Sequence, residues 1–259
     1  MAIINITEDS FSDGGLYIDL HSAINHASLC IKQGAHILDI GAQSTRPGAT
    51  EVGPEIEIKR LVPLIKELKS LHPQLPVSVD TFHHSVAEKV LNVGADWIND
   101  VTGGRYDPKI FNVIADNDST YVLTHSRGNS KSMDSLARYT NVVKDVKNEL
   151  SNQIDLALSN GIKKAQIIID PGIGFAKNVN QNLSLLRNLE EFVSMNYPVL
   201  IGASRKRFIG SVLNEPDPNK RIFGTSAVAS RCVIAGVDIL RIHDVKQISQ
   251  VVKMTKAII

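Results

Sequence analysis

Short apolar runs recur along the chain, and most of them end in a polar residue. The first is AIINIT at residues 2–7, and the others lie at 36–41, 76–81, 96–101, 120–125, 166–171, 198–204 and 237–243. Continuous runs of this length, rich in β-branched residues, are typical of strands that are buried on both faces. The pattern therefore predicts eight buried strands.

The segments between these runs have helical spacing. In EIEIKRLVPLIKELKSL, residues 55–71, apolar residues fall at positions i, i+3, i+4 and i+7. Strands that alternate with helices form parallel sheets, and eight such units in a chain of about 250 residues match a TIM barrel. We therefore predict an α/β fold, a (β/α)8 TIM barrel that forms a single domain over residues 1–259.

A doubly wound open sheet is the alternative architecture. That fold commonly carries a glycine-rich phosphate-binding turn after its first strand. The sequence has no G-x-G-x-x-G at that position and no P-loop, so the barrel is favoured.

The charge balance limits the partners. Lys and Arg number 28 and Asp and Glu number 27, so no overall field attracts nucleic acid or an anionic membrane. We expect neither partner. Cys30 and Cys232 lack the spacing of a metal or redox pair, which indicates buried thiols in a reducing, cytoplasmic setting.

The predicted strand ends carry the candidate chemistry, because active sites of these barrels lie at the carboxyl ends of the strands. A single polar residue there could simply cap a helix or satisfy a turn. The full set predicts a ligand site instead, and it comprises Asn5, Asp39, Asp80, Asn99, His125, Asp170, Ser204, Arg241 and His243.

Two chemistries are combined at this edge. Carboxylates pair well with a planar fork of amino and N–H groups, so the acceptors and the cation suit a flat polar heterocycle, through Asp80, Asn99, Asp170 and Lys206. Further positive charge indicates a phosphate or diphosphate on that heterocycle, through Arg46, Arg205, Arg241 and His243.

The same residues carry a resemblance to a known family. The chain resembles dihydropteroate synthase of folate biosynthesis over essentially its whole length, from the first strand to the eighth. The matching stretches are INITEDSFSDGG (4–15), DIGAQSTRPGA (39–49), SVDT (78–81), INDV (98–101), TH with RG (124–128), DPGIGFAK (170–177), GASRKRFIG (202–210) and RIHDV (241–245).

The resemblance implies a reaction and the roles of its residues. In that family, p-aminobenzoate is joined to 7,8-dihydropterin-6-ylmethyl diphosphate, which gives 7,8-dihydropteroate and pyrophosphate. The resemblance implies a pterin pocket at Asp80, Asn99, Asp170 and Lys206, and Mg²⁺ at Asn5. It implies a diphosphate site at Arg46, Arg241 and His243, with Ser204 beside them. It also implies an aminobenzoate site formed by Phe175, Lys206, Thr45, Pro47 and the loop that contains Asp9. Of these, Asp9, Arg46, Lys206, Arg241 and His243 are expected to act in catalysis.

The resemblance also implies partners and a location. It implies a homodimer, for which the segments 221–235 and 246–258 are the expected surface. It also implies a fusion to upstream folate-synthesis domains with a mitochondrial location, as in some eukaryotic members.

The sequence departs from the family pattern at several positions. The departures are Glu8 in place of Pro, Ala42-Gln43 in place of Gly-Glu, Thr124 in place of Met, and Ala176 in place of Gly.

Three other functions remain open at this point. One is a pterin-binding methyltransferase that passes a methyl group to a corrinoid, and another is a metal-dependent hydrolase barrel. The third is a pterin binder that has lost catalysis through its altered first loop.

Four residues receive structural roles. We expect Trp97 to pack between barrel and helices, His125 to be hydrogen-bonded on the pocket floor, His83 to begin a helix, and Arg207 to face solvent.

Overall fold

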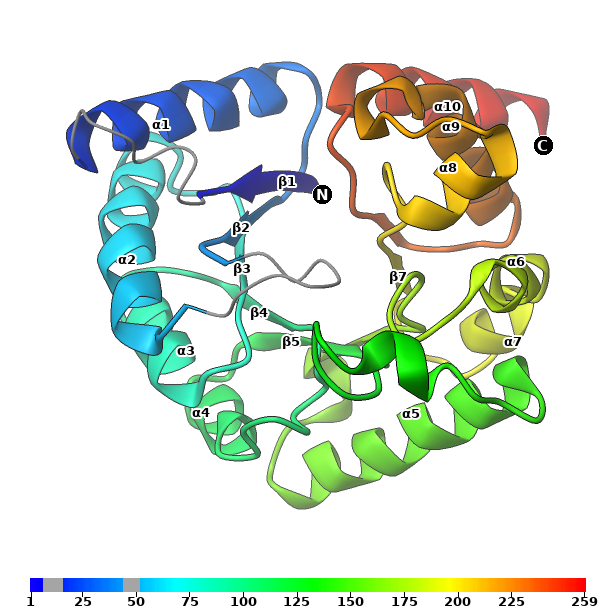
Figure 1. Cartoon of the computed structure of the whole chain (residues 1–259). Coiled ribbons are helices and arrows are strands. Elements are labelled where there is room, and N and C mark those ends of the chain that lie inside the picture. Colours follow the sequence, from blue (N-terminus) through cyan, green and yellow to red (C-terminus); the bar gives the residue numbers. More distant parts are fainter. Residues whose placement is uncertain (7–15, 44–51) are drawn as a thin grey trace.

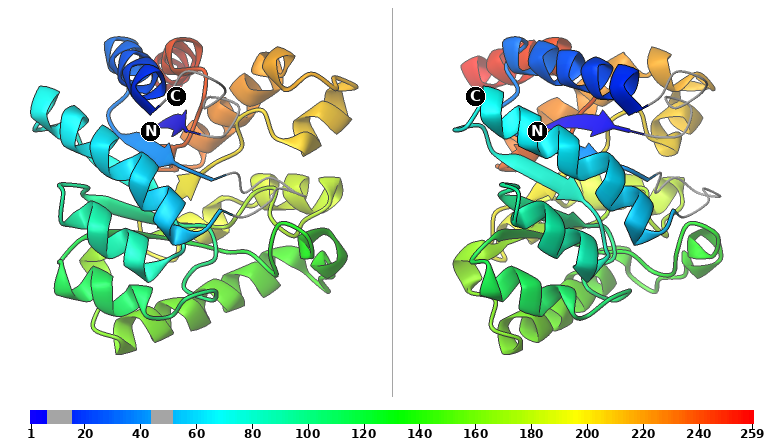
Figure 2. Two further views of the ribbon diagram at one scale, coloured as in Figure 1. Left: turned by 60° about the vertical axis from the view of Figure 1, so that its left-hand side comes forward. Right: turned by 90° about the vertical axis from the view of Figure 1, so that its left-hand side faces the viewer.

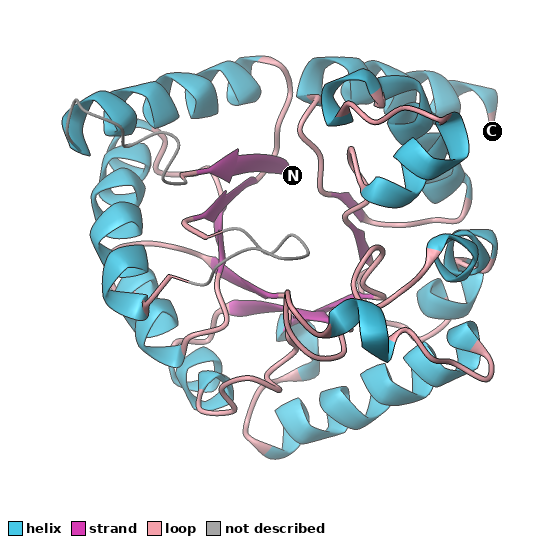
Figure 3. Cartoon of the chain, viewed as in Figure 1, coloured by secondary structure: helices cyan, strands magenta, loops and turns pink. Residues whose placement is uncertain are grey.

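The computed structural model describes residues 1–6, 16–43 and 52–259, and of residues 16–19 only the backbone. Within these ranges, strands form an inner ring and helices an outer ring (Figure 1; Figure 3). The strands are β1 (Ala2–Asn5), β2 (Leu38–Gly41), β3 (Val77–Asp80), β4 (Trp97–Asp100), β5 (Thr120–Thr124), β6 (Ile167–Asp170), β7 (Leu200–Ile201) and β8 (Ile239–Leu240). The helices are α1 (Leu16–Lys32), α2 (Pro54–Leu71), α3 (His84–Leu91), α4 (Ile110–Asp116), α5 (Val142–Ser159), α6 (Val179–Arg187), α7 (Glu190–Val193), α8 (Arg207–Leu213), α9 (Ile222–Ile234) and α10 (Val245–Ile258).

The strands close into a barrel. β1 to β6 pair in parallel in sequence order, and β7 pairs with β8. Ile169 N donates to Pro198 O at 2.9 Å and joins β6 to the β7 segment. Ile3 N donates to Ile242 O at 3.0 Å, and Ile242 N donates to Met1 O at 3.0 Å, which joins the end of β8 back to β1. The predicted TIM barrel is therefore confirmed, and each predicted strand run contains an observed strand.

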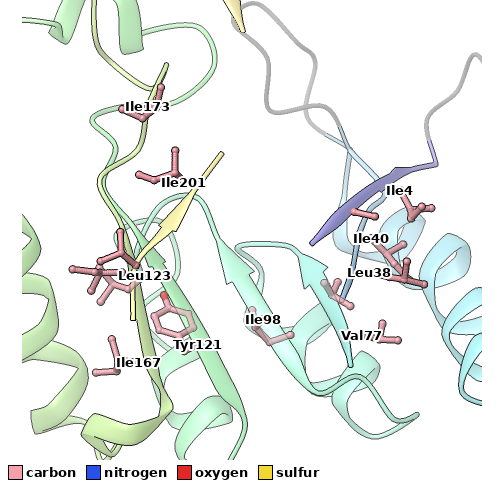
Figure 4. Packing of buried hydrophobic residues seen from close by; sticks show 14 of the residues in the cluster. Ile4, Leu38, Ile40, Val77, Ile98, Tyr121, Leu123, Ile167, Ile173 and Ile201 are labelled. Atoms are coloured by element: carbon pink, nitrogen blue, oxygen red, sulfur yellow. The ribbon is translucent and has the colours of Figure 1, made fainter. Parts of the chain in front are cut away.

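Successive side chains of each strand face alternately toward the helices and into the barrel, although the sequences read as continuous apolar runs. Side chains of one parity, such as Leu38, Ile40 and Val77, pack between the strands and the helices (Figure 4). Their neighbours of the other parity point into the barrel, because successive side chains of a strand face opposite sides. This interior set is polar toward the carboxyl ends of β2 to β4, where it contains Asp39, Ser78, Asp80 and Asn99.

The amino-terminal end of the barrel interior is apolar. Val122, Ile168 and Leu200 form a small buried cluster there, with Trp97 and Ile239 packed against it. The expectation that Trp97 packs between barrel and helices was wrong, because Trp97 lies two positions before the inward-facing Asn99 and so shares its side of the strand. This apolar layer closes the barrel beneath the polar mouth.

The outer helices follow their sequence signals. The helix expected at 55–71 is α2, which begins at Pro54, a residue suited to a first helical position. α9 and α10, expected at 221–235 and 246–258, pack against each other, and the side views show the helices outside the strands (Figure 2). Cys30 and Cys232 are buried free thiols. None of the described helices combines the length and apolar character that a membrane crossing requires.

Candidate active site

A buried cation holds two carboxylates together at the barrel mouth. Arg241, which follows β8, donates from Nε to Asp39 Oδ2 at 2.5 Å and from Nη2 to Asp80 Oδ2 at 2.7 Å. Burial lowers the pKa of the Arg241 guanidinium, but Asp39 and Asp80 outweigh that effect and raise it above its usual value. Asn99 Nδ2 donates to Asp39 Oδ2 at 3.2 Å, so residues from β2, β3, β4 and β8 form one network.

Asp80 keeps one acceptor available within this network. Its Oδ1 is buried and has no hydrogen-bond partner in the described part of the chain. Burial raises the pKa of the Asp80 carboxyl to about 7, although Arg241 acts in the opposite direction. A buried acceptor without a partner is costly, so this oxygen is suited to an N–H donor supplied by a ligand.

Asp170, the last residue of β6, and Lys206, which follows β7, also lie at the mouth. Asp170 Oδ1 accepts from Gly172 N at 2.7 Å, and burial raises the pKa of the Asp170 carboxyl. Lys206 Nζ donates to Ile173 O and lies 4.3 Å from the centre of the Phe175 ring. Burial lowers the pKa of the Lys206 ammonium to about 8, against the opposing charge of Asp170.

Ser204 and His243 form an adjacent pair. Ser204 Oγ accepts from His243 N at 3.2 Å and lies 3.0 Å from His243 Nδ1. Arg205, which the sequence placed among the phosphate-binding cations, is engaged by Asp244 at 2.5 Å and by Asn219 at 2.7 Å instead. The Ser204 hydroxyl and the His243 imidazole therefore lie close in sequence to Lys206 and Arg241, two residues from each.

Asn5 ends β1 with an exposed side chain beside the carboxylates. A Cβ added to Gly41 would lie 3.6 Å from Asn5 Oδ1 and 3.8 Å from Asp80 Oδ2. Gly41 therefore lies between the side chains of Asn5 and Asp80. The amide oxygen of Asn5 thus faces the same mouth as Asp80.

A pocket of about 300 Å³ opens between the segments that follow β2 to β6, and Phe175 is the predicted site residue that lines it in the described part of the chain. Phe175 forms one wall, and Arg105 and Arg127 contribute guanidinium groups. Its other apolar walls are Phe82, Val101, Tyr106 and Met133. An aromatic ligand that reached past Phe175 would enter this pocket.

The structure brings most of the predicted site residues together. They are Asn5, Asp80, Asn99, Asp170, Phe175, Ser204, Lys206, Arg241 and His243. The remaining predicted residues, Asp9, Thr45, Arg46 and Pro47, lie outside the described residues, as does Glu8.

Two buried charged residues, Asp39 and Lys177, were not assigned a role by sequence reasoning. Asp39 appeared only as one strand end among several, yet it anchors Arg241. Lys177 is 3% exposed and contacts His125, whose Nε2 lies 3.0 Å from Glu149 Oε2. The signal for Lys177 was its place inside the apolar stretch IGFAKN, where an unpaired lysine would be costly.

The sequence also predicts structural roles for His125, Arg207 and His83. His125 is fully buried and hydrogen-bonded, and Arg207 is exposed in an ion pair with Asp134, as expected. His83 precedes α3, and its Nε2 lies 3.5 Å from Glu57 Oε1. Among the described residues, no three His, Cys, Asp or Glu side chains gather into a possible metal site.

Comparisons with known proteins agree with this geometry. The family model described as pterin binding enzyme matches residues 1–243. The dihydropteroate synthase of Synechocystis sp. is 43% identical over 258 residues, which cover 100% of this chain and 89% of that protein. The mitochondrial folate synthesis bifunctional protein of Pisum sativum is 40% identical, and the chain spans 53% of it.

Solved structures are similarly close. A dihydropteroate synthase from Clostridium difficile, determined with pteroic acid, superposes with a TM-score of 0.93 at 40% identity and covers 100% of this chain and 95% of that one. The Xanthomonas albilineans enzyme with 4-aminobenzoic acid gives 0.92 at 38% identity, with 100% and 92% covered. The chain therefore belongs to the dihydropteroate synthases of the pterin-binding enzyme family.

Proposed function

We infer that the barrel mouth carries out the dihydropteroate synthase reaction. The C–O bond between the pterin methylene and the diphosphate breaks, and a C–N bond forms to the amine of p-aminobenzoate. One proton is released together with pyrophosphate. Solved relatives hold pteroic acid and 4-aminobenzoic acid, which are chemically the joined product class and one of the two substrates.

The observation that carries this proposal is the pair of buried carboxylates with acceptors directed into the mouth. Asp80 has an oxygen without a partner, and Asp170 is held by Gly172 N at one oxygen only. The amino and N–H edge of a pterin supplies donors in the planar arrangement that a carboxylate accepts. The buried hydrogen bond between Asn99 and Asp39 and the Lys206 ammonium complete a polar floor for the heterocycle.

The cations beside this floor support a diphosphate site. Arg241, His243 and Lys206 follow β8 and β7, the region in which barrels of this class commonly bind phosphate. Fixed positive charge that faces a departing anion stabilises the charge as it develops. The Phe175 ring beside Lys206 then provides an apolar wall for the aromatic amine.

Mg²⁺ is part of the proposal, with Asn5 as its protein ligand. Mg²⁺ takes oxygen ligands, commonly one or two from the protein and the rest from phosphates and water. The exposed amide of Asn5 beside Asp80 fits that requirement. When bound, the ion neutralises charge on the diphosphate.

The proposal is tested by release of pyrophosphate from the purified full chain. The reaction contains the pterin diphosphate, p-aminobenzoate and Mg²⁺, and each component is omitted in turn. We expect release only when both organic substrates are present. Pterin binding without release would favour the non-catalytic pterin binder, and methyl transfer to a corrinoid would favour the methyltransferase alternative.

A homodimer through α9 and α10 is also proposed. Phe223 and Ile234 on α9 are 83% and 58% exposed, and their spacing of eleven residues places them on one helix face. Met254 and Ile258 extend this apolar surface onto α10 with exposures of 62% and 71%. Light scattering of the unmodified chain and of Phe223→Glu tests it, and we expect a dimer that the substitution converts to a monomer.

Location and fusion partners stay predictions. A cytoplasmic or mitochondrial site can be tested by fractionation of the source cells. The size of the protein in those cells shows whether upstream folate-synthesis domains are joined to this barrel.

A further inference from the structure

The loop that connects β6 to α6 contains a buried lysine, Lys177, whose amino group has three polar contacts within the protein. Lys177 Nζ donates to Gly172 O at 2.9 Å and to Phe175 O at 2.9 Å, and it lies 3.0 Å from His125 Nδ1. An ammonium has three donors and no acceptor. All three polar contacts of Lys177 Nζ therefore lie inside the protein, and none is left for a substrate.

Asp170 and Glu149 favour the ammonium form of Lys177, whereas burial acts against it and lowers the pKa of the side chain well below its usual value. Glu149 Oε2 lies 3.0 Å from His125 Nε2, and Arg127 donates to both oxygens of Glu149. A carboxylate beside Nε2 favours the tautomer with its proton on Nε2, which leaves Nδ1 as an acceptor. Burial and Lys177 lower the pKa of His125 to about 3, so the ring is neutral. The Nδ1 lone pair then receives an N–H from Lys177.

The loop held by Lys177 carries two residues of the proposed site. Gly172, whose carbonyl Lys177 holds, donates its N–H to Asp170 at 2.7 Å. Phe175, whose carbonyl Lys177 also holds, places its ring beside Lys206. Between them, Gly174 N donates to Asn182 Oδ1 at 2.6 Å.

The loop also contains strain that these bonds oppose. Ala176 has φ +48, a left-handed conformation that side chains other than glycine rarely adopt. Gly172 has φ +70, and a Cβ there would lie 1.8 Å from His125 O, so the loop is pressed against the end of β5. A loop with this conformation persists only where its surroundings hold it.

We propose that Lys177 is a positioning residue that fixes the Asp170 carboxylate and the Phe175 ring in one geometry without touching either substrate. This inference rests on the proposed function, because it gives Asp170 the pterin and Phe175 the aromatic amine. One buried ammonium then serves both subsites. Loss of its three hydrogen bonds weakens binding at both.

The main test is Lys177→Met in the full chain, which keeps the length of the side chain and removes its donors. We expect the Kd for 6-hydroxymethyl-7,8-dihydropterin and the KM for p-aminobenzoate each to rise about tenfold. A merely structural role would lower kcat through the folded fraction and leave both constants unchanged. The control is Lys163→Met. Lys163 precedes the amino-terminal end of β6, and its side chain is 70% exposed. Constants within about twofold of the unmodified chain in folded Lys177→Met would overturn the proposal.

If Lys177→Met does not fold, Glu149→Gln decides. Glu149 is 29% exposed. A glutamine in its place can donate to His125 Nε2, so the ring proton can move to Nδ1 and Nδ1 no longer accepts from Lys177. The charged groups around the Lys177 ammonium are Asp170, Lys206, Glu149 and Arg127. We expect the ratio of pterin Kd values, variant to unmodified, to be at least about threefold at pH 7, because the carboxylate that orients His125 toward Lys177 is lost.

Glu191→Gln is the matched control, because Glu191 is 55% exposed and pairs with Lys147 on the same α5 helix. A ratio that stays near one in Glu149→Gln would overturn the proposal. Direct pterin titration needs no turnover, so its outcome is separate from that of the proposed function. An unmodified chain that binds pterin without releasing pyrophosphate would overturn only the latter.

Discussion

Arg241 lies 2.7 Å from Asp80 in space and 161 residues from it in sequence. The same guanidinium contacts Asp39 at 2.5 Å, so it neutralises a pair of carboxylates that would otherwise repel each other inside the barrel. Arg241 was expected from the sequence to serve the diphosphate. In the structure it also favours the charged forms of Asp39 and Asp80 in the proposed pterin pocket.

Arg241→Ala is therefore expected to affect both stability and pterin binding. Two buried carboxylates lose their cation, which should cost about 3 kcal/mol of unfolding free energy at pH 7 in urea denaturation. Because Arg241 lowers the pKa of Asp80, its loss should raise that pKa above about 7 and protonate the carboxyl. Pterin affinity should then recover partly between pH 7 and pH 9, when calorimetric titration is done on the folded variant. Unchanged stability and unchanged pterin affinity would contradict the network.

Asp170→Asn tests the pterin contact itself. An asparagine oxygen can still accept from Gly172 N, so the loop should keep its shape, while the charge-assisted bond to the ligand is lost. We expect pterin affinity to fall by about 2 to 3 kcal/mol. Asp118→Asn, with a side chain 69% exposed, is the matched control and should bind as the unmodified chain does. Equal affinities in all three proteins would remove Asp170 from the site.

Ala176→Gly should stabilise the chain. The left-handed conformation at Ala176 costs about 1 kcal/mol that a glycine avoids, although part of this gain is offset by the greater freedom of glycine in the unfolded chain. Thermal unfolding should show a higher Tm. Ala157→Gly in the interior of α5 is the control, where the same change should destabilise by about 1 kcal/mol. A lower Tm for Ala176→Gly would mean that the loop has another conformation in solution.

Glu57 gives the clearest pH dependence of stability. Its side chain in α2 is fully buried, and burial raises the pKa of its carboxyl from 4.5 to about 8. The folded state therefore holds a proton that the unfolded chain releases above about pH 4.5, and the stability contributed by this proton is lost as pH rises toward 8.

Glu57→Gln should remove this pH dependence. We expect the variant to be more stable than the unmodified chain by about 2 kcal/mol at pH 8 and by less than about 1 kcal/mol at pH 5. Urea denaturation at the two pH values measures the difference. A gain that is larger at pH 5 would show that Glu57 is ionised in the folded protein.

The fold could be predicted from the sequence because its strands are short, apolar and regularly spaced. Each run in the sequence contains an observed strand, since burial on both faces favours continuous apolar runs, with polar residues mostly toward the carboxyl ends. The exact strand ends could not be predicted, as in β7, where only Leu200–Ile201 of the run 198–204 pairs. Trp97 was misplaced because its parity relative to Asn99 was not considered.

The site could be predicted only as a set of strand ends. Position at the carboxyl end of a strand identified Asp80, Asp170 and Arg241, but the pairing of Arg241 with Asp39 depends on barrel closure across 202 residues. The Lys177 cluster joins β5, α5 and the β6–α6 loop, so no local pattern contains it. Such contacts follow from tertiary packing and become visible only in the folded chain.

The most direct measurement is the stoichiometry of the reaction. Pyrophosphate and 7,8-dihydropteroate are quantified in the same sample during turnover by the unmodified chain, with Asp170→Asn in parallel. The account predicts one pyrophosphate for each dihydropteroate formed, and a strongly reduced rate for the variant at low pterin concentration. Pyrophosphate release without dihydropteroate, or equal rates for the two proteins, would contradict a synthase site at this barrel mouth.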